Sequence, residues 1–262
     1  MNYKLWENGT PFYDEKIGQP EPTLTPYLCA GNEIRGCVIV FPGGGYSGRA
    51  AHEGEPIAKM INEAGVHAFV LNYRVAPYRH PAELGDAQRA VRFVRYHAAE
   101  FGINPEKIGV LGFSAGGHLA VTASELFDYG LDEGDEIDRV SCRPDAGIFC
   151  YPVVSFKKYR HCGTRTNLLG ELENDEALQT LLSGELSVPD DMPPAFIWHT
   201  MEDGAVHVRN SLDLCAAMKE KNIPCEMHIF PYGAHGLGLA QSNKDVAQWA
   251  GLLQNWLLMY GF

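Results

Sequence analysis

The stretch Gly112-Phe113-Ser114-Ala115-Gly116 constrains the fold of this chain more than any other segment. It follows a short apolar run at residues 107–111 and opens onto a helix-like run at 117–123. A strand, a tight turn and a helix in this order hold a serine on a sharp corner with its hydroxyl exposed. Glycines are needed on both sides of the corner because the two backbones pass so close that a Cβ atom would clash. The pattern therefore predicts a strand–turn–helix unit with Ser114 at its corner.

Short apolar runs and amphipathic runs alternate along the chain, as in a mostly parallel sheet with helices on both faces. The apolar runs predict strands at 37–41, 66–71, 107–111, 146–153, 195–198 and 225–230, with an antiparallel edge strand at 23–28. The amphipathic runs predict helices at 56–64, 86–99, 208–219 and 244–258. In the helix at 86–99, Arg89, Arg92 and Arg95 are expected to face away from a stripe of small apolar residues.

A chain of 262 residues is long enough for one sizeable α/β domain, and we interpret residues 1–262 as a single domain. The segment 156–194 interrupts the alternation, since loops between a strand and its successor usually run to about six residues. We expect a small insertion there. An insertion at the carboxyl edge of a sheet often covers a site, so a lid and a passive surface excursion both remain open for it.

Ser114 needs two partners to become a nucleophile, a base that takes its proton and an acid that orients this base. In this setting the partners follow in the order Asp or Glu, then His. Asp203 comes after the predicted strand at 195–198, in a loop where active-site groups gather in open α/β sheets. Glu202 is the alternative acid. His235 lies in a glycine-flanked loop after the strand at 225–230 and is the expected base.

Three successive glycines, residues 43–45, directly follow the predicted strand at 37–41. Such a run lets the backbone turn its N–H groups toward a developing oxyanion, and each donor can lower the barrier by about 3 kcal/mol. Gly44 and Gly45 are the expected donors, joined by the N–H of Ala115 after the nucleophile. A flexible loop remains open as an alternative, whereas a phosphate cradle is disfavoured because no Gly-Lys-Ser/Thr follows the glycines.

Together these motifs carry a resemblance to α/β-hydrolase-fold esterases. The chain resembles the esterase/lipase group with a glycine-rich oxyanion motif, and more narrowly the bacterial acetyl-xylan-esterase-like, BD-FAE-type carbohydrate esterases. The resemblance covers nearly all of the chain from about residue 22. Its supporting segments are 42–46, 53–56, 71–77, 112–120, 198–203 and 233–236.

The resemblance implies a serine carboxylic-ester hydrolase without a cofactor, acting on short acyl esters, above all acetyl esters of a carbohydrate. Its substrate would be a small molecule or an oligosaccharide ester, and the sequence leaves a homo-oligomer open. Tyr46 and Tyr78 are candidates for an aromatic wall against a sugar ring, or are buried tyrosines with satisfied hydroxyls. Two alternatives remain, an amide-cleaving or peptidase-like hydrolase with the same triad and a non-catalytic ligand-binding protein.

The composition of the chain argues against some classes of partner and indicates a cellular compartment. A net charge of −12 argues against nucleic acid and anionic membrane surfaces as partners. Seven scattered cysteines without a C-x-x-C motif suggest neither a disulfide framework nor a zinc site, and ten histidines show no metal-ligand spacing. From these spacings we expect no metal site. The N-terminal residues lack the apolar stretch of a signal peptide, so we expect a cytoplasmic protein.

Overall fold

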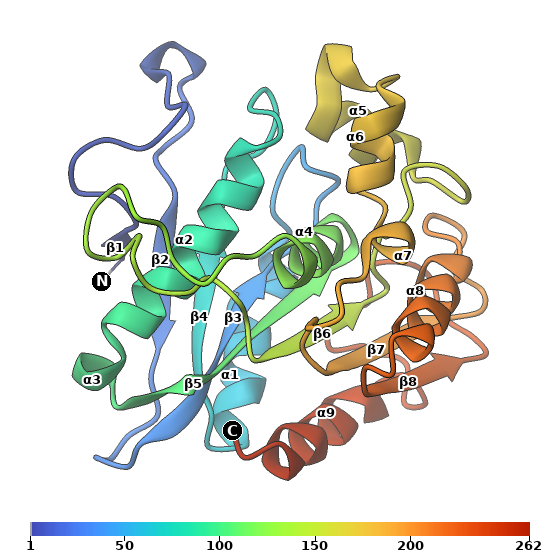
Figure 1. Cartoon of the computed structure of the whole chain (residues 1–262). Coiled ribbons are helices and arrows are strands. Elements are labelled where there is room, and N and C mark those ends of the chain that lie inside the picture. The colour runs from blue at the N-terminus through green and yellow to red at the C-terminus, as the bar shows by residue number, and fades with distance from the viewer. Residues whose placement is uncertain (1) are drawn as a thin grey trace.

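Eight strands form one sheet in the computed structural model, which describes residues 2–262 (Figure 1). From one edge to the other they are β1 (Tyr3–Lys4), β2 (Thr23–Tyr27), β4 (His67–Asn72), β3 (Arg35–Phe41), β5 (Ile103–Phe113), β6 (Ala146–Cys150), β7 (Ala195–Thr200) and β8 (Cys225–Phe230). β2 is antiparallel to β1 and to β4, and all the other neighbours are parallel. The expected mostly parallel sheet is confirmed, and so is the antiparallel direction of β2. The expectation that β2 forms the edge of the sheet is wrong, because the short β1 pairs with its outer side.

Helices cover both faces of this sheet because its central strands are apolar on both sides. In β3, Ile39 and Phe41 pack in the core that α2, α4 and α8 cover, whereas Val38 and Val40 pack in the core under α1 and α9. The helices are α1 (Glu55–Glu63), α2 (Ala82–Tyr96), α3 (Ala98–Phe101), α4 (Ser114–Glu125), α5 (Cys162–Leu169), α6 (Glu176–Leu181), α7 (Gly184–Ser187), α8 (Arg209–Glu220) and α9 (Gln248–Met259).

Several element ends differ from the sequence prediction. β5 begins at Ile103 rather than at 107, because its first residues pair with Arg35 of β3 beyond an irregularity in the ladder. β6 ends at Cys150 rather than at 153. α9 begins at Gln248 rather than at 244, because the Asn243 side chain accepts the N–H of Val246 and holds the preceding residues in a turn.

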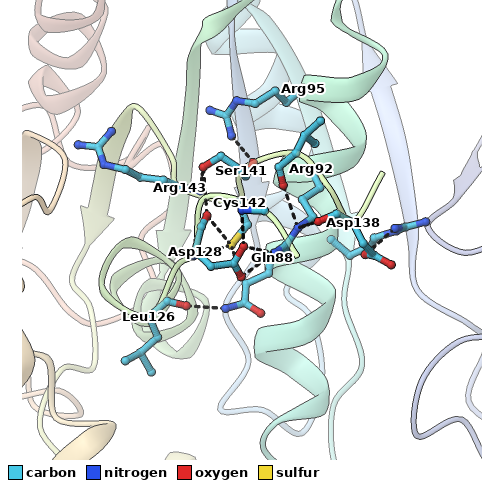
Figure 2. Close-up of polar contacts among 12 residues, drawn as sticks. Gln88, Arg92, Arg95, Leu126, Asp128, Asp138, Ser141, Cys142 and Arg143 are labelled. Carbon is cyan, nitrogen blue, oxygen red and sulfur yellow. Dashed lines mark hydrogen bonds and ion pairs between the residues drawn. The ribbon is translucent and has the colours of Figure 1, made fainter. Parts of the chain in front are cut away.

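The arginines of α2 lie on the side away from the apolar stripe, and the segment 126–145 covers them (Figure 2). Arg89 and Arg92 are only 2% and 3% exposed. Arg92 lies 2.6 Å from the Asp128 carboxylate and also donates to the carbonyl of Val140. Arg95 lies 2.8 Å from Asp145. This face of α2 therefore anchors a long connection by ion pairs instead of facing water.

Between β6 and β7 the chain forms α5, a short 3₁₀ turn (Gly170–Leu172), α6 and α7. α5 and α6 rise above the ends of the strands, at the upper right of Figure 1. Asn167 of α5 donates from its side chain to the carbonyl of Gly45 at 2.8 Å, and Leu168 accepts the N–H of His80. The expected insertion at 156–194 thus contacts the glycine run directly, while its action as a lid stays a prediction.

Candidate active site

Ser114 is the first residue of α4 and stands at the sharp corner between β5 and that helix. Its φ is +53°, a left-handed conformation that is strained for a residue with a side chain. A Cβ atom on Gly112 would lie 2.0 Å from the carbonyl oxygen of Gly116. A Cβ atom on Gly116 would lie 2.2 Å from the carbonyl oxygen of Phe41. Only glycines fit these two positions, and they allow the corner that presents the serine.

The structure brings Ser114, His235 and Asp203 into one hydrogen-bonded chain. His235 Nε2 lies 2.8 Å from Ser114 Oγ, and His235 Nδ1 lies 2.6 Å from Asp203 Oδ2. A carboxylate can only accept, so Nδ1 carries the proton and Nε2 is free to accept the serine hydroxyl. His235 comes from the loop after β8 and Asp203 from the loop after β7, as parallel strands with adjacent carboxyl ends allow.

Asp203 is held by donors on both carboxylate oxygens. Oδ1 accepts the N–H groups of Ala205 at 2.9 Å and Val206 at 2.8 Å. Oδ2 also faces Nε2 of His199, at 3.2 Å. Burial alone would raise the pKa of Asp203, but these donors and His235 outweigh it and hold the pKa well below its usual range. Asp203 therefore stays ionised next to His235 at neutral pH.

Glu202, the alternative acid, points elsewhere. Glu202 is exposed, and its Oε2 accepts the N–H of Gly233 at 3.1 Å. Among the described residues it makes no hydrogen bond to His235. The geometry therefore favours Asp203 as the orienting acid.

The glycine run lies beside the serine. A Cβ atom on Gly43 would come within 3.1 Å of the Ser114 Cβ atom. Gly44 and Gly45 both have positive φ, +138° and +63°, which glycine tolerates best. Within residues 2–262 no hydrogen bond takes up the N–H of Gly44 or Gly45, and Ala115 lies in the first turn of α4, where N–H groups have no intrahelical partner.

Tyr46 and Tyr78, the candidates for a sugar-binding wall, are buried, with exposed fractions of 1% and 4%. The hydroxyl of Tyr46 lies 2.9 Å from Nδ1 of His118, and that of Tyr78 donates to the carbonyl of Asp14. Burial lowers the pKa of His118 to about 4, so this imidazole is neutral at pH 7 and accepts from Tyr46. Of the two interpretations of these tyrosines, the geometry favours buried residues with satisfied hydroxyls.

The sequence reasoning missed two polar residues behind the site, Glu53 and Tyr151. Both are buried, and their side chains are hydrogen-bonded to each other at 2.6 Å. They lie about a hundred positions apart in the chain, so no local pattern pairs them. Glu53 begins the supporting segment 53–56 and precedes a predicted helix, but a carboxylate in that position is common as a capping acid and does not indicate a role in the site.

The structure contains no cluster of three or more His, Cys, Asp or Glu side chains suited to a metal ion within the residues that it describes. Within the same residues no helix combines the length and the apolarity needed to cross a bilayer.

Comparison with known proteins identifies the family. The family model BD-FAE matches residues 27–218 of the chain. The chain belongs to the BD-FAE family. The expected resemblance to this branch of esterases is thereby confirmed, and the sheet with helices on both faces is the α/β-hydrolase fold found in solved relatives.

Named relatives of this BD-FAE chain are hydrolases. An acetyl ester-xyloside bifunctional hydrolase from Caldicellulosiruptor lactoaceticus has 47% identity and a TM-score of 0.97, over all of this chain and 97% of that one. Endo-1,4-beta-xylanase B of Butyrivibrio fibrisolvens is 38% identical over 251 residues, 94% of this chain and 39% of that protein. Acetylxylan esterase of Xylanibacter ruminicola is 33% identical over 225 residues, 84% of this chain and 45% of that protein.

The BD-FAE chain thus spans less than half the length of these two curated relatives, which carry further sequence of their own. The expectation of an enzyme of the esterase type agrees with the family and with the relatives' names.

Proposed function

We propose that the protein is a serine carboxylic-ester hydrolase that removes short acyl groups, above all acetyl, from a carbohydrate. The observation that carries this proposal is the hydrogen-bonded chain from Ser114 through His235 to Asp203, at 2.8 and 2.6 Å. The acyl group and the carbohydrate come from the names of an acetylxylan esterase and an acetyl ester-xyloside hydrolase among the relatives.

In the first half of the proposed reaction, Ser114 Oγ attacks the ester carbonyl while His235 Nε2 takes the hydroxyl proton. Asp203 stabilises the imidazolium that forms and keeps the ring oriented. The carbonyl oxygen becomes an oxyanion facing the N–H groups of Gly44, Gly45 and Ala115. His235 then gives its proton to the leaving alcohol, and an acyl-serine ester remains.

In the second half, water replaces the alcohol. His235 takes a proton from this water, which attacks the acyl-serine carbonyl through a second oxyanion. Collapse of this intermediate returns the proton to Ser114 Oγ and releases the free carboxylic acid. Apart from the substrate and this water, every group that acts in these two halves belongs to the chain.

A hydrolysis panel tests the proposal. It comprises acetylated xylo-oligosaccharides, feruloyl esters, p-nitrophenyl esters of increasing acyl length and aminoacyl p-nitroanilides. We expect the highest kcat/KM on acetyl esters, with a steep loss as the acyl chain lengthens. Turnover of the anilides without turnover of acetyl esters would overturn the proposal in favour of an amide hydrolase, and no turnover of any substrate would favour a binding protein.

A further inference from the structure

Glu53 is a carboxylate buried between the glycine run and the loop that carries His235. Glu53 is 2% exposed and is the last residue of a 3₁₀ turn (Ala51–Glu53) just before α1. Burying a charged carboxylate is costly unless donors surround it. The donors of Glu53 belong to parts of the chain that are far apart in sequence, which distinguishes it from a residue that merely caps a helix.

One donor is the glycine run itself. The N–H of Gly43 donates to Glu53 Oε2 at 2.7 Å, and the carbonyl of Gly43 accepts the N–H of Ala50 at 2.8 Å. The N–H and the carbonyl of Gly43 are therefore both occupied by hydrogen bonds within the chain. The next two N–H groups, those of Gly44 and Gly45, are the ones left without an internal partner in residues 2–262. Glu53 thus takes up the first N–H of the run, and the two that follow are available to an oxyanion.

The other donor leads to the histidine loop. Tyr151 donates its hydroxyl to Glu53 Oε1 at 2.6 Å, and the same hydroxyl accepts the N–H of Gly238 at 2.9 Å. Burial and the neighbouring Glu53 raise the pKa of Tyr151, so it keeps the proton that it donates. The ring of Tyr151 also contacts that of His235 edge to face, with 5.0 Å between ring centres.

The adjacent residue makes a third link between the same two loops. Nε2 of His52 lies 2.9 Å from the carbonyl oxygen of Gly236, the residue that follows His235. Residues 52–53 therefore contact the glycine run at Gly43 and the loop of the base at Gly236, and Tyr151 links Glu53 to Gly238 of the same loop.

We propose that Glu53 is a positioning residue that, with Tyr151, fixes the free N–H groups of the glycine run relative to His235. The inference rests on the proposed function, because it assigns Glu53 a share in the geometry of the oxyanion site. Small displacements of catalytic groups can lower rates about a hundredfold, so a residue that touches no substrate can still control kcat.

Glu53→Gln tests the role with little change in volume. Glutamine offers one acceptor oxygen where Gly43 and Tyr151 present two donors, so one link is lost. We expect kcat on p-nitrophenyl acetate to fall about 10- to 100-fold while KM changes less than about threefold. Affinity for a short-chain trifluoromethyl ketone, whose serine adduct carries an oxyanion, should fall in parallel with kcat.

Tyr151→Phe removes the hydroxyl bridge and keeps the ring against His235, so it tests the link even if Glu53→Gln does not fold. We expect a smaller loss of kcat, about 3- to 10-fold, and a double variant whose loss is less than the product of the two single losses. Glu125→Gln is the matched control, since Glu125 is also buried but lies at the opposite end of α4 from Ser114, about 16 Å away. It should keep the wild-type kcat.

The outcomes separate the inference from the proposed function. If the wild-type protein hydrolyses acetyl esters but a folded Glu53→Gln or Tyr151→Phe variant keeps the wild-type kcat and ketone affinity, the positioning role is wrong. If kcat falls equally in Glu125→Gln, the loss in Glu53→Gln comes from a general loss of stability, and the positioning role of Glu53 is also wrong. If the wild-type protein hydrolyses no ester, the proposed function itself fails.

Discussion

One oxygen of the Asp203 carboxylate lies 2.6 Å from Nδ1 of His235. Because a carboxylate that accepts this N–H fixes the tautomer of the imidazole, Asp203→Asn should reverse it and lower kcat about a thousandfold or more. Glu202→Gln changes a neighbouring exposed carboxylate that contacts Gly233 instead, and we expect kcat within about twofold of wild type. Steady-state kinetics of both variants decide the matter. A larger loss in the Glu202 variant would reverse the assignment.

The contact between Asn167 and Gly45 predicts that the insertion supports the oxyanion run. Asn167→Ala removes the hydrogen bond from the side chain to the Gly45 carbonyl, and we expect kcat/KM for acetyl esters to fall about fivefold with the melting temperature unchanged within a few degrees. Asn104→Ala, at the opposite end of β5 from the serine, is the control and should behave as wild type. Equal kcat/KM in the two variants would show that α5 plays no part in catalysis.

Glu83 makes stability depend on pH. It is fully buried at the start of α2, neither of its carboxylate oxygens has a partner among the described residues, and burial raises its pKa to about 8. Between pH 4.5 and 8 the folded chain therefore holds a proton at Glu83 that the unfolded chain has lost, so the free energy of unfolding falls as pH rises.

Glu83→Gln should remove this dependence. Relative to wild type, the variant should gain about 3 kcal/mol in the free energy of unfolding between pH 5 and pH 8. Urea titrations at the two pH values measure the gain. A difference between variant and wild type that does not change with pH would contradict the assignment.

Substitution of Arg92 should lower the stability of the fold without affecting catalysis. Its buried guanidinium pairs with Asp128, which is partly exposed, and removing it leaves the Val140 carbonyl without that donor. We expect Arg92→Ala to lower the free energy of unfolding by about 2 kcal/mol and to leave kcat unchanged at a temperature where the variant is folded. Loss of kcat in the folded variant would show that segment 126–145 reaches the active site.

Much of the fold follows from local pattern in the sequence. The run at 37–41 lies in β3 as predicted, because a strand buried on both faces needs continuous apolar residues. The run at 225–230 is also a strand where predicted, although β8 is a half-buried edge strand that includes Glu226 and His228. The sharp corner at Ser114 could also be predicted from the glycines on either side of it, since a corner this tight excludes a Cβ atom. Element ends such as the start of α9 depend on single side-chain contacts that periodicity does not record.

The supporting residues of the site could not be predicted in the same way. Asp203 and His235 follow strands in a characteristic order, whereas Glu53 and Tyr151 meet only after the sheet has formed. The contact between His199 and Asp203 likewise becomes apparent only from the structure. The burial of Tyr46 depends on His118, which lies 72 positions further along the chain.

The central claim is that Ser114 carries the acyl group during ester hydrolysis. The most direct measurement is to mix the protein with p-nitrophenyl acetate, quench with acid during the first turnovers, and locate the added acetyl group by peptide mass spectrometry. We predict acetyl on the peptide that contains Ser114, and neither acetylation nor turnover in Ser114→Ala, whose fold should be intact. Turnover at the wild-type rate in Ser114→Ala, or acetyl trapped on a different residue, would contradict the account.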